Sequence, residues 1–274
     1  MKTILAASDF SEISRNAATY AAGLALKCKA ELILFHAFHP PVIISDGAVT
    51  LVSANDQKKE ALSRLRRFAG QLKRKFGPKL RVTCECRYGL AVDELQSLVK
   101  EKGADLVAMG IKSSSIVNEK LFGSTALSFI KNASCAVLTI NNDISFRAPK
   151  RILIAVDYRE YWPVLPESLI TLVRLCKAEV HLLHISQGER AIAKAARKIS
   201  SGRFHEQLDG INHSFHDAVG NDVENAIAEY ARNGKFDMVV MTPHHHSFLE
   251  ALFHTPSTEK YAFHGDLPLM SIHG

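Results

Sequence analysis

Short apolar runs alternate with amphipathic stretches along the whole chain. The apolar runs are four to seven residues long and are bounded by polar or turn-forming residues, a pattern typical of strands buried on both faces of a parallel sheet. Between them, apolar residues recur three and four positions apart, as they do on helices with one buried face. In the first half of the chain the pattern predicts strands at 3–8, 32–38, 80–86, 105–109 and 136–140.

Helices are expected between these strands. Ser11 is a favourable N-cap for the first of them, and Gly103 is a favourable C-cap for the third. No element is expected in the long segment 39–55. Five strands alternating with four helices predict a doubly wound parallel sheet. The predicted helices lie at 11–28, 56–76, 92–102 and 123–132.

The same sequence blocks occur twice. The blocks ILAASD, ending at Asp9, and CKAE, ending at Glu31, return 148 residues later as ILIAVD and CKAE, and His36 returns at the same separation. Asp105 and the two apolar residues after it match a block 132 residues later, at Asp237, so the second copy is 16 residues shorter in between. We interpret the chain as a tandem duplication.

The second copy repeats the order of elements. The polar segment 141–150, which contains Pro149, links the two copies. We expect two domains, at 1–142 and 149–274, that pack as an intramolecular pseudo-dimer without forming one continuous sheet. In the second copy, strands are predicted at 151–156, 180–185, 211–215, 238–241 and 267–272, and helices from 164, around 190–199 and at 222–233.

Composition narrows the class of protein. The chain has 274 residues, of which 47% are hydrophobic and 23% charged, as expected for a soluble globular protein. No apolar run approaches the ~20 residues that cross a bilayer, and Asp9 interrupts the first apolar run, so neither membrane insertion nor a signal peptide is expected. Five cysteines in apolar patterns indicate reduced, buried thiols and a cytoplasmic protein. They are Cys28, Cys84, Cys86, Cys135 and Cys176.

The segment 106–125, LVAMGIKSSSIVNEKLFGST, carries the main candidate chemistry. Gly110 follows a buried strand directly, where a residue without Cβ can turn sharply and approach a ligand. After a loop rich in serine, Gly123, Ser124 and Thr125 open a predicted helix. Free N–H groups, the positive end of the helix dipole and two hydroxyls converge there, which suits a phosphate. An ordinary strand–loop–helix connection would also explain these residue types.

The spacing Gly110-x2-Ser113-x9-Gly123-Ser124 resembles the G-x2-G-x9-G-[S/T] loop of the universal stress protein family. Together with the duplication, the resemblance covers nearly the whole chain. It implies two Rossmann-like domains of the adenine nucleotide alpha hydrolase-like type in tandem, paired through their last strands at 136–140 and 268–272. It also implies ATP as the ligand of the first domain, with ADP or AMP as alternatives and Mg²⁺ as a companion ion. Ser113 departs from the family motif, which has glycine at this position. Its additional Cβ narrows the loop beside the phosphates.

The resemblance also assigns contacts residue by residue. It places Asp9 near the ribose and adenine, Ala37 against adenine, and Met109 with Gly110 beside the phosphates. The full set of expected nucleotide-binding residues is Ala7, Asp9, Ala37, Met109, Gly110, Ser113, Gly123, Ser124 and Thr125.

The second copy departs further from the motif. At the 132-residue separation Thr242 replaces Gly110, His245 replaces Ser113, Thr255 replaces Gly123 and Pro256 replaces Ser124. A proline removes an N–H that a phosphate needs. We therefore expect the second domain not to bind ATP in the usual way and to serve as a pairing or regulatory partner.

Two other features of the sequence suggest ligands less specifically. His244, His245 and His246 are potential metal ligands, but adjacent residues rarely face one ion, so we favour a solvated loop.

The helix at 56–76 carries eight Lys and Arg residues, which could attract nucleic acid. No aromatic platform or binding module accompanies them, so we favour an ordinary solvated helix face and expect neither nucleic-acid nor membrane binding.

Three functions compete on this basis. The first is an ATP-binding stress-response or regulatory protein without significant turnover. The second is a slow ATPase. That reaction needs charge compensation and usually a general base, and the loop offers one carboxylate, Glu119, with Lys112 as the candidate cation. The third is an interaction protein whose two nucleotide sites have both decayed. A homodimer is compatible with each.

Overall fold

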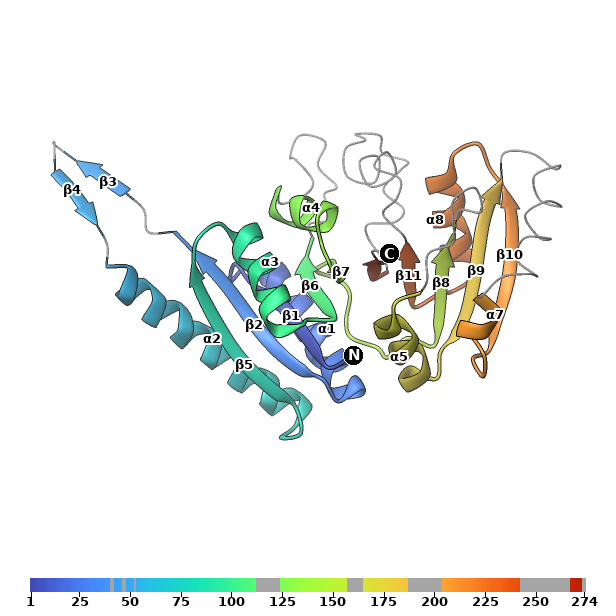
Figure 1. Ribbon diagram of the computed structural model, residues 1–274, viewed down its shortest axis with the longest axis horizontal. Helices are drawn as coiled ribbons and strands as arrows, with labels where there is room; N and C mark the ends of the chain where they lie inside the picture. Colours follow the sequence, from blue (N-terminus) through green and yellow to red (C-terminus); the bar gives the residue numbers. More distant parts are fainter. Residues whose placement is uncertain are drawn as a thin grey trace.

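The computed structural model describes residues 1–39, 42–45, 48–51, 53–111, 124–156, 165–186, 204–241 and 267–272. Ten strands form one sheet in the order β10-β9-β8-β11-β12-β7-β6-β1-β2-β5 (Figure 1). The first half contributes β1 (Thr3–Ala7), β2 (Glu31–Phe38), β5 (Arg81–Tyr88), β6 (Leu106–Gly110) and β7 (Ala136–Ile140). The second half contributes β8 (Arg151–Ala155), β9 (Glu179–Ser186), β10 (His213–Val219), β11 (Met238–Met241) and β12 (Leu269–Ser271).

Each half is a doubly wound parallel unit, as the sequence pattern predicts. Within each half every neighbouring pair of strands is parallel, and the third, second, first, fourth and fifth strands follow one another across the sheet. The described helices are α1 (Glu12–Cys28), α2 (Ala54–Phe76), α3 (Ala91–Lys102) and α4 (Ser124–Lys131) in the first half, and α5 (Glu167–Cys176), α7 (Phe204–Gln207) and α8 (Val223–Asn233) in the second.

Two apolar cores cover the two faces of the sheet. One contains side chains of α1, α2 and α5, including Tyr20, Leu65 and Leu169. The other contains side chains of α3, α4 and α8, including Leu98 and Phe129. The strands read as nearly continuous apolar runs because both of their faces are buried.

The duplication is visible in individual hydrogen bonds. The Oδ2 atom of Asp105 accepts from the backbone N–H groups of Lys2 and Thr3 at 2.5 and 2.9 Å. In the second half Asp237 accepts in the same way from Lys150 and Arg151, at 2.7 and 2.9 Å. Each aspartate thereby ties the start of its fourth strand to the start of its first strand.

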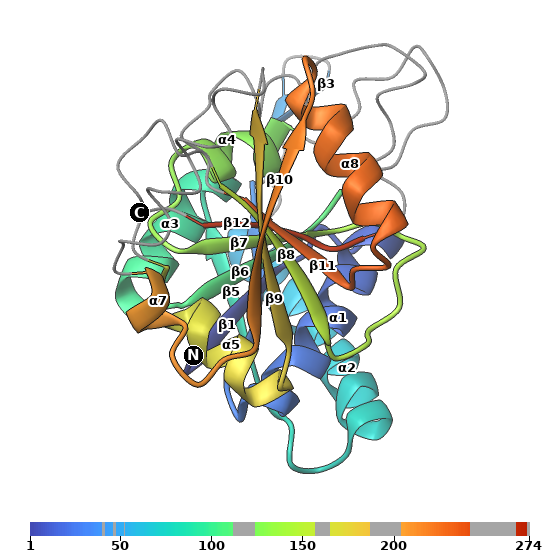
Figure 2. The ribbon, with the colours of Figure 1, turned by 90° about the vertical axis from the view of Figure 1, so that its right-hand side faces the viewer.

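The two halves are joined by their last strands. β7 and β12 pair antiparallel, with Leu138 opposite Met270, and both of these side chains are fully buried. The predicted pairing of the last strands is thus present, but the expectation that it would leave two separate sheets is wrong. Each last strand is the edge of its own parallel unit and offers free N–H and C=O groups, so pairing the two edges makes the sheet continuous. Figure 2 shows the accumulated twist, with β10 upright and β7 and β12 running across it.

Some elements differ from the sequence-based expectation. Within 39–55, where none was expected, β3 (Val42–Ser45) and β4 (Ala48–Leu51) form an antiparallel two-stranded hairpin separate from the main sheet. β10 begins two residues later than predicted and extends to Val219, and α7 was not predicted. The helix expected around 190–199 lies outside the described residues.

Two further expectations concern the thiols and the membrane. All five cysteines are free thiols; Cys28, Cys86 and Cys176 are buried, while Cys84 and Cys135 are only partly buried. Among the helices of the described ranges, none is long and apolar enough to span a membrane.

Candidate functional site

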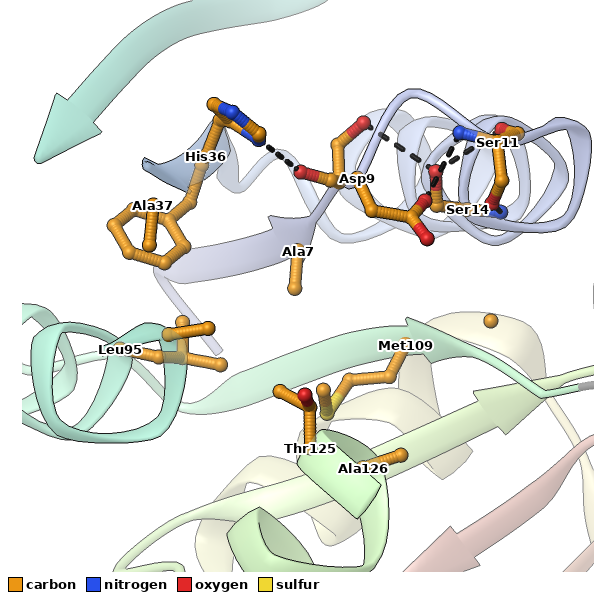
Figure 3. A pocket seen from close by; sticks show the side chains of 14 residues that line it. Ala7, Asp9, Ser11, Ser14, His36, Ala37, Leu95, Met109, Thr125 and Ala126 are labelled. Carbon is orange, nitrogen blue, oxygen red and sulfur yellow. Dashed lines mark hydrogen bonds between the residues drawn. The ribbon is translucent and has the colours of Figure 1, made fainter. Parts of the chain in front are cut away.

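A cavity of about 200 Å³ opens at the carboxyl ends of β1, β2 and β6 (Figure 3). This edge of a doubly wound sheet is where ligands bind, near the point at which strand order reverses. In the first half that point lies between β1 and β6, because the chain crosses from one side of β1 to the other there. The starts of α1, α3 and α4 supply the remaining walls.

Six of the nine predicted binding residues line this one cavity. They come from four separate parts of the sequence, which the fold brings together. Ser124 begins α4 beside it, although the structure describes only its backbone. Ser113 and Gly123 lie outside the described residues. The six lining residues are Ala7, Asp9, Ala37, Met109, Gly110 and Thr125.

The turn after β1 is held by serine side chains. The backbone N–H of Ser8 donates to the carbonyl of Phe35 at 2.8 Å, extending the β1–β2 pairing by one bond. The Ser8 hydroxyl accepts from the N–H of Phe10 at 3.1 Å, and Phe10 has a φ of 67°. Ser11 then caps α1, since its Oγ accepts from the N–H of Ser14 at 3.2 Å. A left-handed Phe10 thus turns the chain directly from strand to helix.

Asp9 is fixed at the mouth of the cavity by this turn. Its Oδ1 accepts from the N–H of Ser11 at 2.9 Å. The surrounding protein removes part of the water around the carboxyl, which by itself raises its pKa. Hydrogen bonds from the side chain and the backbone N–H of Ser11 act in the opposite direction, and with the other hydrogen bonds of the turn they hold the pKa of Asp9 below its usual value of 3.8. Asp9 is therefore an ionised acceptor at neutral pH.

His36 has a structural role beside the cavity. Its Nδ1–H donates to the carbonyl of Ser8 at 2.7 Å, and its ring lies 4.4 Å from that of Phe10. Burial lowers the pKa of His36, which keeps the ring neutral near pH 7. In the second half His184 makes the same contact with the carbonyl of Val156, at 3.2 Å. The repeated histidine thus links the second strand of each unit to the end of the first, as a packed structural role requires.

Gly110 is required by packing as well as by the cavity. A Cβ at this position would lie 2.7 Å from Cγ2 of Ile13 and 2.8 Å from the Ile13 carbonyl group. Backbone atoms cannot yield as a flexible side chain can, so a larger residue would push α1 away from β6. From the sequence, we expected this glycine to allow the approach of a ligand. The structure adds the approach of a helix.

The chemistry of the described walls is simple. Phe35, Leu95 and Met109 form apolar surface on the inner side, and Asp9 with the serines after β1 forms a polar edge. Among the described lining residues, Asp9 and His36 are the titratable ones. Such a cavity can enclose a flat apolar ring system and accept hydrogen bonds from hydroxyl groups at its edge.

Sequence analysis did not identify every residue of the site. Ala91 and Leu95 reach the cavity from α3, and Ala126 reaches it from α4. They belong to the apolar stripes of their helices and carry no separate signal. Ser8 was part of a repeated block, but Val156 replaces it in the second copy, so repetition did not single it out.

The equivalent site of the second domain lies mostly outside the described residues. This holds for Asp157, for Thr242 and Thr255, and for the three candidate metal ligands His244, His245 and His246. In the described ranges, no group of three or more His, Cys, Asp or Glu residues is arranged to hold a metal ion.

Comparison with known proteins decides the family. The model of the universal stress protein family matches twice, at residues 1–141 and 149–273. The chain belongs to the universal stress protein family. Among curated proteins it is 28% identical over 144 residues to the universal stress protein MJ0531 of Methanocaldococcus jannaschii, a match that covers 51% of this chain and 81% of that protein.

A solved universal stress protein shares the fold over both domains. One from Archaeoglobus fulgidus DSM 4304 superposes with a TM-score of 0.70 at 16% identity, covering 99% of this chain and 96% of that one. Another, in complex with cAMP, is 22% identical with a TM-score of 0.41, covering 52% of this chain and 98% of its own. The first match extends over both domains, so the whole chain has the tandem universal stress protein fold.

Proposed function

We propose that this universal stress protein binds an adenine nucleotide, ATP in the first instance, in its first domain and acts as a regulatory stress-response protein without significant turnover. The observation that carries the proposal is the convergence of Ala7, Asp9, Ala37, Met109, Gly110 and Thr125 on one cavity. The domains are taken as 1–142 and 149–274.

The adenine end of the ligand fits the inner part of the cavity. Ala7 and Ala37 have small side chains at the ends of neighbouring strands, which leaves room for a flat ring, and Leu95 and Met109 provide apolar contacts. About 200 Å³ suits a purine ring better than a whole nucleotide. The ribose and phosphates then extend towards the start of α4 and the segment 112–123.

Asp9 serves as the acceptor for the ribose. Its carboxylate is ionised at neutral pH and is held by Ser11, so it is already oriented before a ligand arrives. A ribose offers two adjacent hydroxyl donors, and hydrogen bonds between hydroxyls and a carboxylate are short and strong.

The phosphates are assigned to Gly110, Ser113, Gly123, Ser124 and Thr125. α4 begins at Ser124, and the first N–H groups of a helix have no acceptor within it, so they are available to an anion. Mg²⁺ would be held by the phosphates together with the hydroxyl of Ser124 or Thr125. In the second domain Pro256 stands at the position of Ser124 and removes one of these donors.

The test of nucleotide binding is mass analysis of ligand that co-purifies with the native full-length protein, followed by calorimetric titration with ATP, ADP, AMP and cAMP. We expect ATP to bind most tightly, because phosphates add contacts at the helix start. Failure of all four nucleotides to bind would contradict the proposal and favour an interaction protein with decayed sites.

We also expect catalysis to be negligible. Hydrolysis needs an aimed water and compensation of charge on the γ-phosphate, and binding alone does not lower the barrier. In single-turnover assays with Mg²⁺, bound ATP should persist for many minutes. Robust turnover that Glu119→Gln or Lys112→Ala abolishes would instead establish the slow ATPase.

A further inference from the structure

A second cavity lies in the second domain, at the amino ends of its strands. Its volume is about 510 Å³, and it opens where β8 and β9 begin, between the end of α5 and residues 210–212. Figure 1 shows α5 at the lower edge of the sheet, below β8. Four basic residues line this cavity, which we call the basic hollow: Lys150, Arg151, Arg174 and Lys177.

The two acidic residues near the basic hollow, Glu179 and Asp237, already contact residues at or next to the strands β8 and β9. Glu179 is the acidic residue of the lining. Its Oε1 lies 3.3 Å from Nε2 of His181, and its Oε2 lies 3.9 Å from Nε of Arg151. Asp237 accepts from the backbone N–H groups of Lys150 and Arg151. The lining thus combines four cationic side chains with one carboxylate, and that carboxylate is held towards the sheet.

Two of the cations are held in place and two are open to a ligand. Lys150 Nζ donates to the carbonyl of Cys176 at 3.0 Å, and Arg151 Nη1 donates to the carbonyl of Gly234 at 2.8 Å. Arg174 and Lys177 are exposed. Within the part of the chain that the structure describes, neither of their side chains has an ion pair or hydrogen bond.

The end of α5 does not oppose an anion as strongly as a bare helix terminus would. The carbonyl of Arg174 accepts from the N–H of Lys177, and that of Val173 accepts from the N–H of Ala178. With Lys150 donating to the carbonyl of Cys176, three carbonyls at this helix end are hydrogen-bonded, which reduces their negative potential towards the hollow.

The first domain lacks two of these cations. At the 148-residue separation, Lys150 and Lys177 correspond to Lys2 and Lys29, whereas Arg151 and Arg174 correspond to Thr3 and Leu26. The two arginines therefore distinguish the second copy, in which the nucleotide loop has degenerated. Arginine presents a planar fork of donors that matches phosphate oxygens.

We infer that the basic hollow is a binding site for a small molecule that carries one or more phosphate groups. Its volume lies within the ~300–1,000 Å³ usual for small-molecule sites. Arg174 and Lys177 contact the phosphate, while Lys150 and Arg151 supply positive charge from fixed positions. The site is separate from the nucleotide cavity, because it lies in the other domain and the two cavities share no lining residue.

The experiment is a calorimetric titration of inorganic tripolyphosphate into full-length protein carrying Gly123→Pro, which disables the proposed phosphate site of the first domain. A remaining binding event is expected. Adding Arg174→Gln and Lys177→Gln should weaken it about tenfold or more, as loss of charge-assisted hydrogen bonds does. The matched control is Lys29→Gln, which removes the first-domain equivalent of Lys177 and should leave binding unchanged.

Lys29, Arg174 and Lys177 are exposed, and circular dichroism checks that the variants fold. The inference is overturned if no binding remains in the Gly123→Pro protein, if the double substitution has no effect, or if Lys29→Gln weakens binding equally. It is also overturned if sodium sulfate at equal ionic strength displaces tripolyphosphate completely. None of these outcomes depends on whether ATP binds to the first domain.

Discussion

At the scale of single residues, Gly110 shows how one position serves packing and a site at once. It ends β6, lines the cavity and lies against the backbone of Ile13 in α1. The close approach of helix and strand places the α1 turn, with Asp9, at the edge of the cavity. A sequence motif indicates that glycine is required there, but it does not indicate whether a ligand or a packed helix requires it.

Gly110→Ala should destabilise the protein by ~1–3 kcal/mol, because the added Cβ overlaps the Ile13 backbone. The matched control is Gly70→Ala in α2, where an added Cβ meets nothing within 4 Å. That change should stabilise by up to ~1 kcal/mol through helix propensity. Denaturant unfolding measures both, and equal effects of the two substitutions would contradict the packing argument.

The lowered pKa of the Asp9 carboxyl predicts that the stability of the protein depends on pH. The pKa of its carboxyl is lowered in the folded protein from the usual 3.8, so its hydrogen bonds stabilise the fold above that pH and lose this effect as the pH falls below it. The free energy of unfolding of the native protein should therefore exceed that of Asp9→Asn by a constant amount above about pH 5 and by less towards about pH 3. A difference that grows on acidification would contradict this sign.

At the scale of elements, the paired aspartates are the clearest structural device of the duplication. Asp105 and Asp237 each hold two backbone N–H groups at the start of a first strand. Their repetition was visible in the sequence as part of a matching block, but their partners were not, because Lys2 and Thr3 lie over a hundred positions from Asp105.

Asp105→Ala and Asp237→Ala should each destabilise the protein by ~1–3 kcal/mol, because two backbone donors lose their acceptor. Asp105→Asn is the matched control, since it retains one acceptor oxygen and should cost less. Thermal and denaturant unfolding measure these effects. If alanine and asparagine at position 105 are equivalent, the hydrogen bonds do not account for the role of Asp105.

The order of the elements was predictable because burial on both faces gives strands a continuous apolar signal. β7 and β11 begin and end where the pattern placed them, at 136–140 and 238–241. The β3–β4 hairpin was missed because its residues were read as one long loop. β10 was shifted because it is an edge strand in which no residue is fully buried, so its apolar pattern is weak.

At the scale of the whole molecule, the sheet passes without interruption from one domain to the other. The resemblance to the universal stress protein family indicated that the last strands would pair, and the pairing of β7 with β12 agrees with that prediction. Continuity of the sheet was not foreseen, since hydrogen bonding between two edges depends on their distance and alignment. The candidate site was predictable to the extent that a family motif supplied it, while its α3 wall depends on tertiary packing alone.

The second domain departs from the nucleotide-loop motif at more positions than the first, so the two domains should differ in nucleotide binding. The first retains glycine, serine and threonine at the start of α4, whereas the second has Thr255 and Pro256 at the corresponding positions. A protein built from two similar folds should therefore bind nucleotide in only one of them.

The most direct test is the stoichiometry of ATP binding to the full-length chain by calorimetry. We predict that a single ATP binds per chain. Gly123→Pro should abolish this binding, because it removes an N–H and blocks the approach of the phosphates, whereas Thr255→Ala should retain it. Two ATP molecules per chain, or equal loss of binding in both variants, would contradict the assignment of the nucleotide to the first domain.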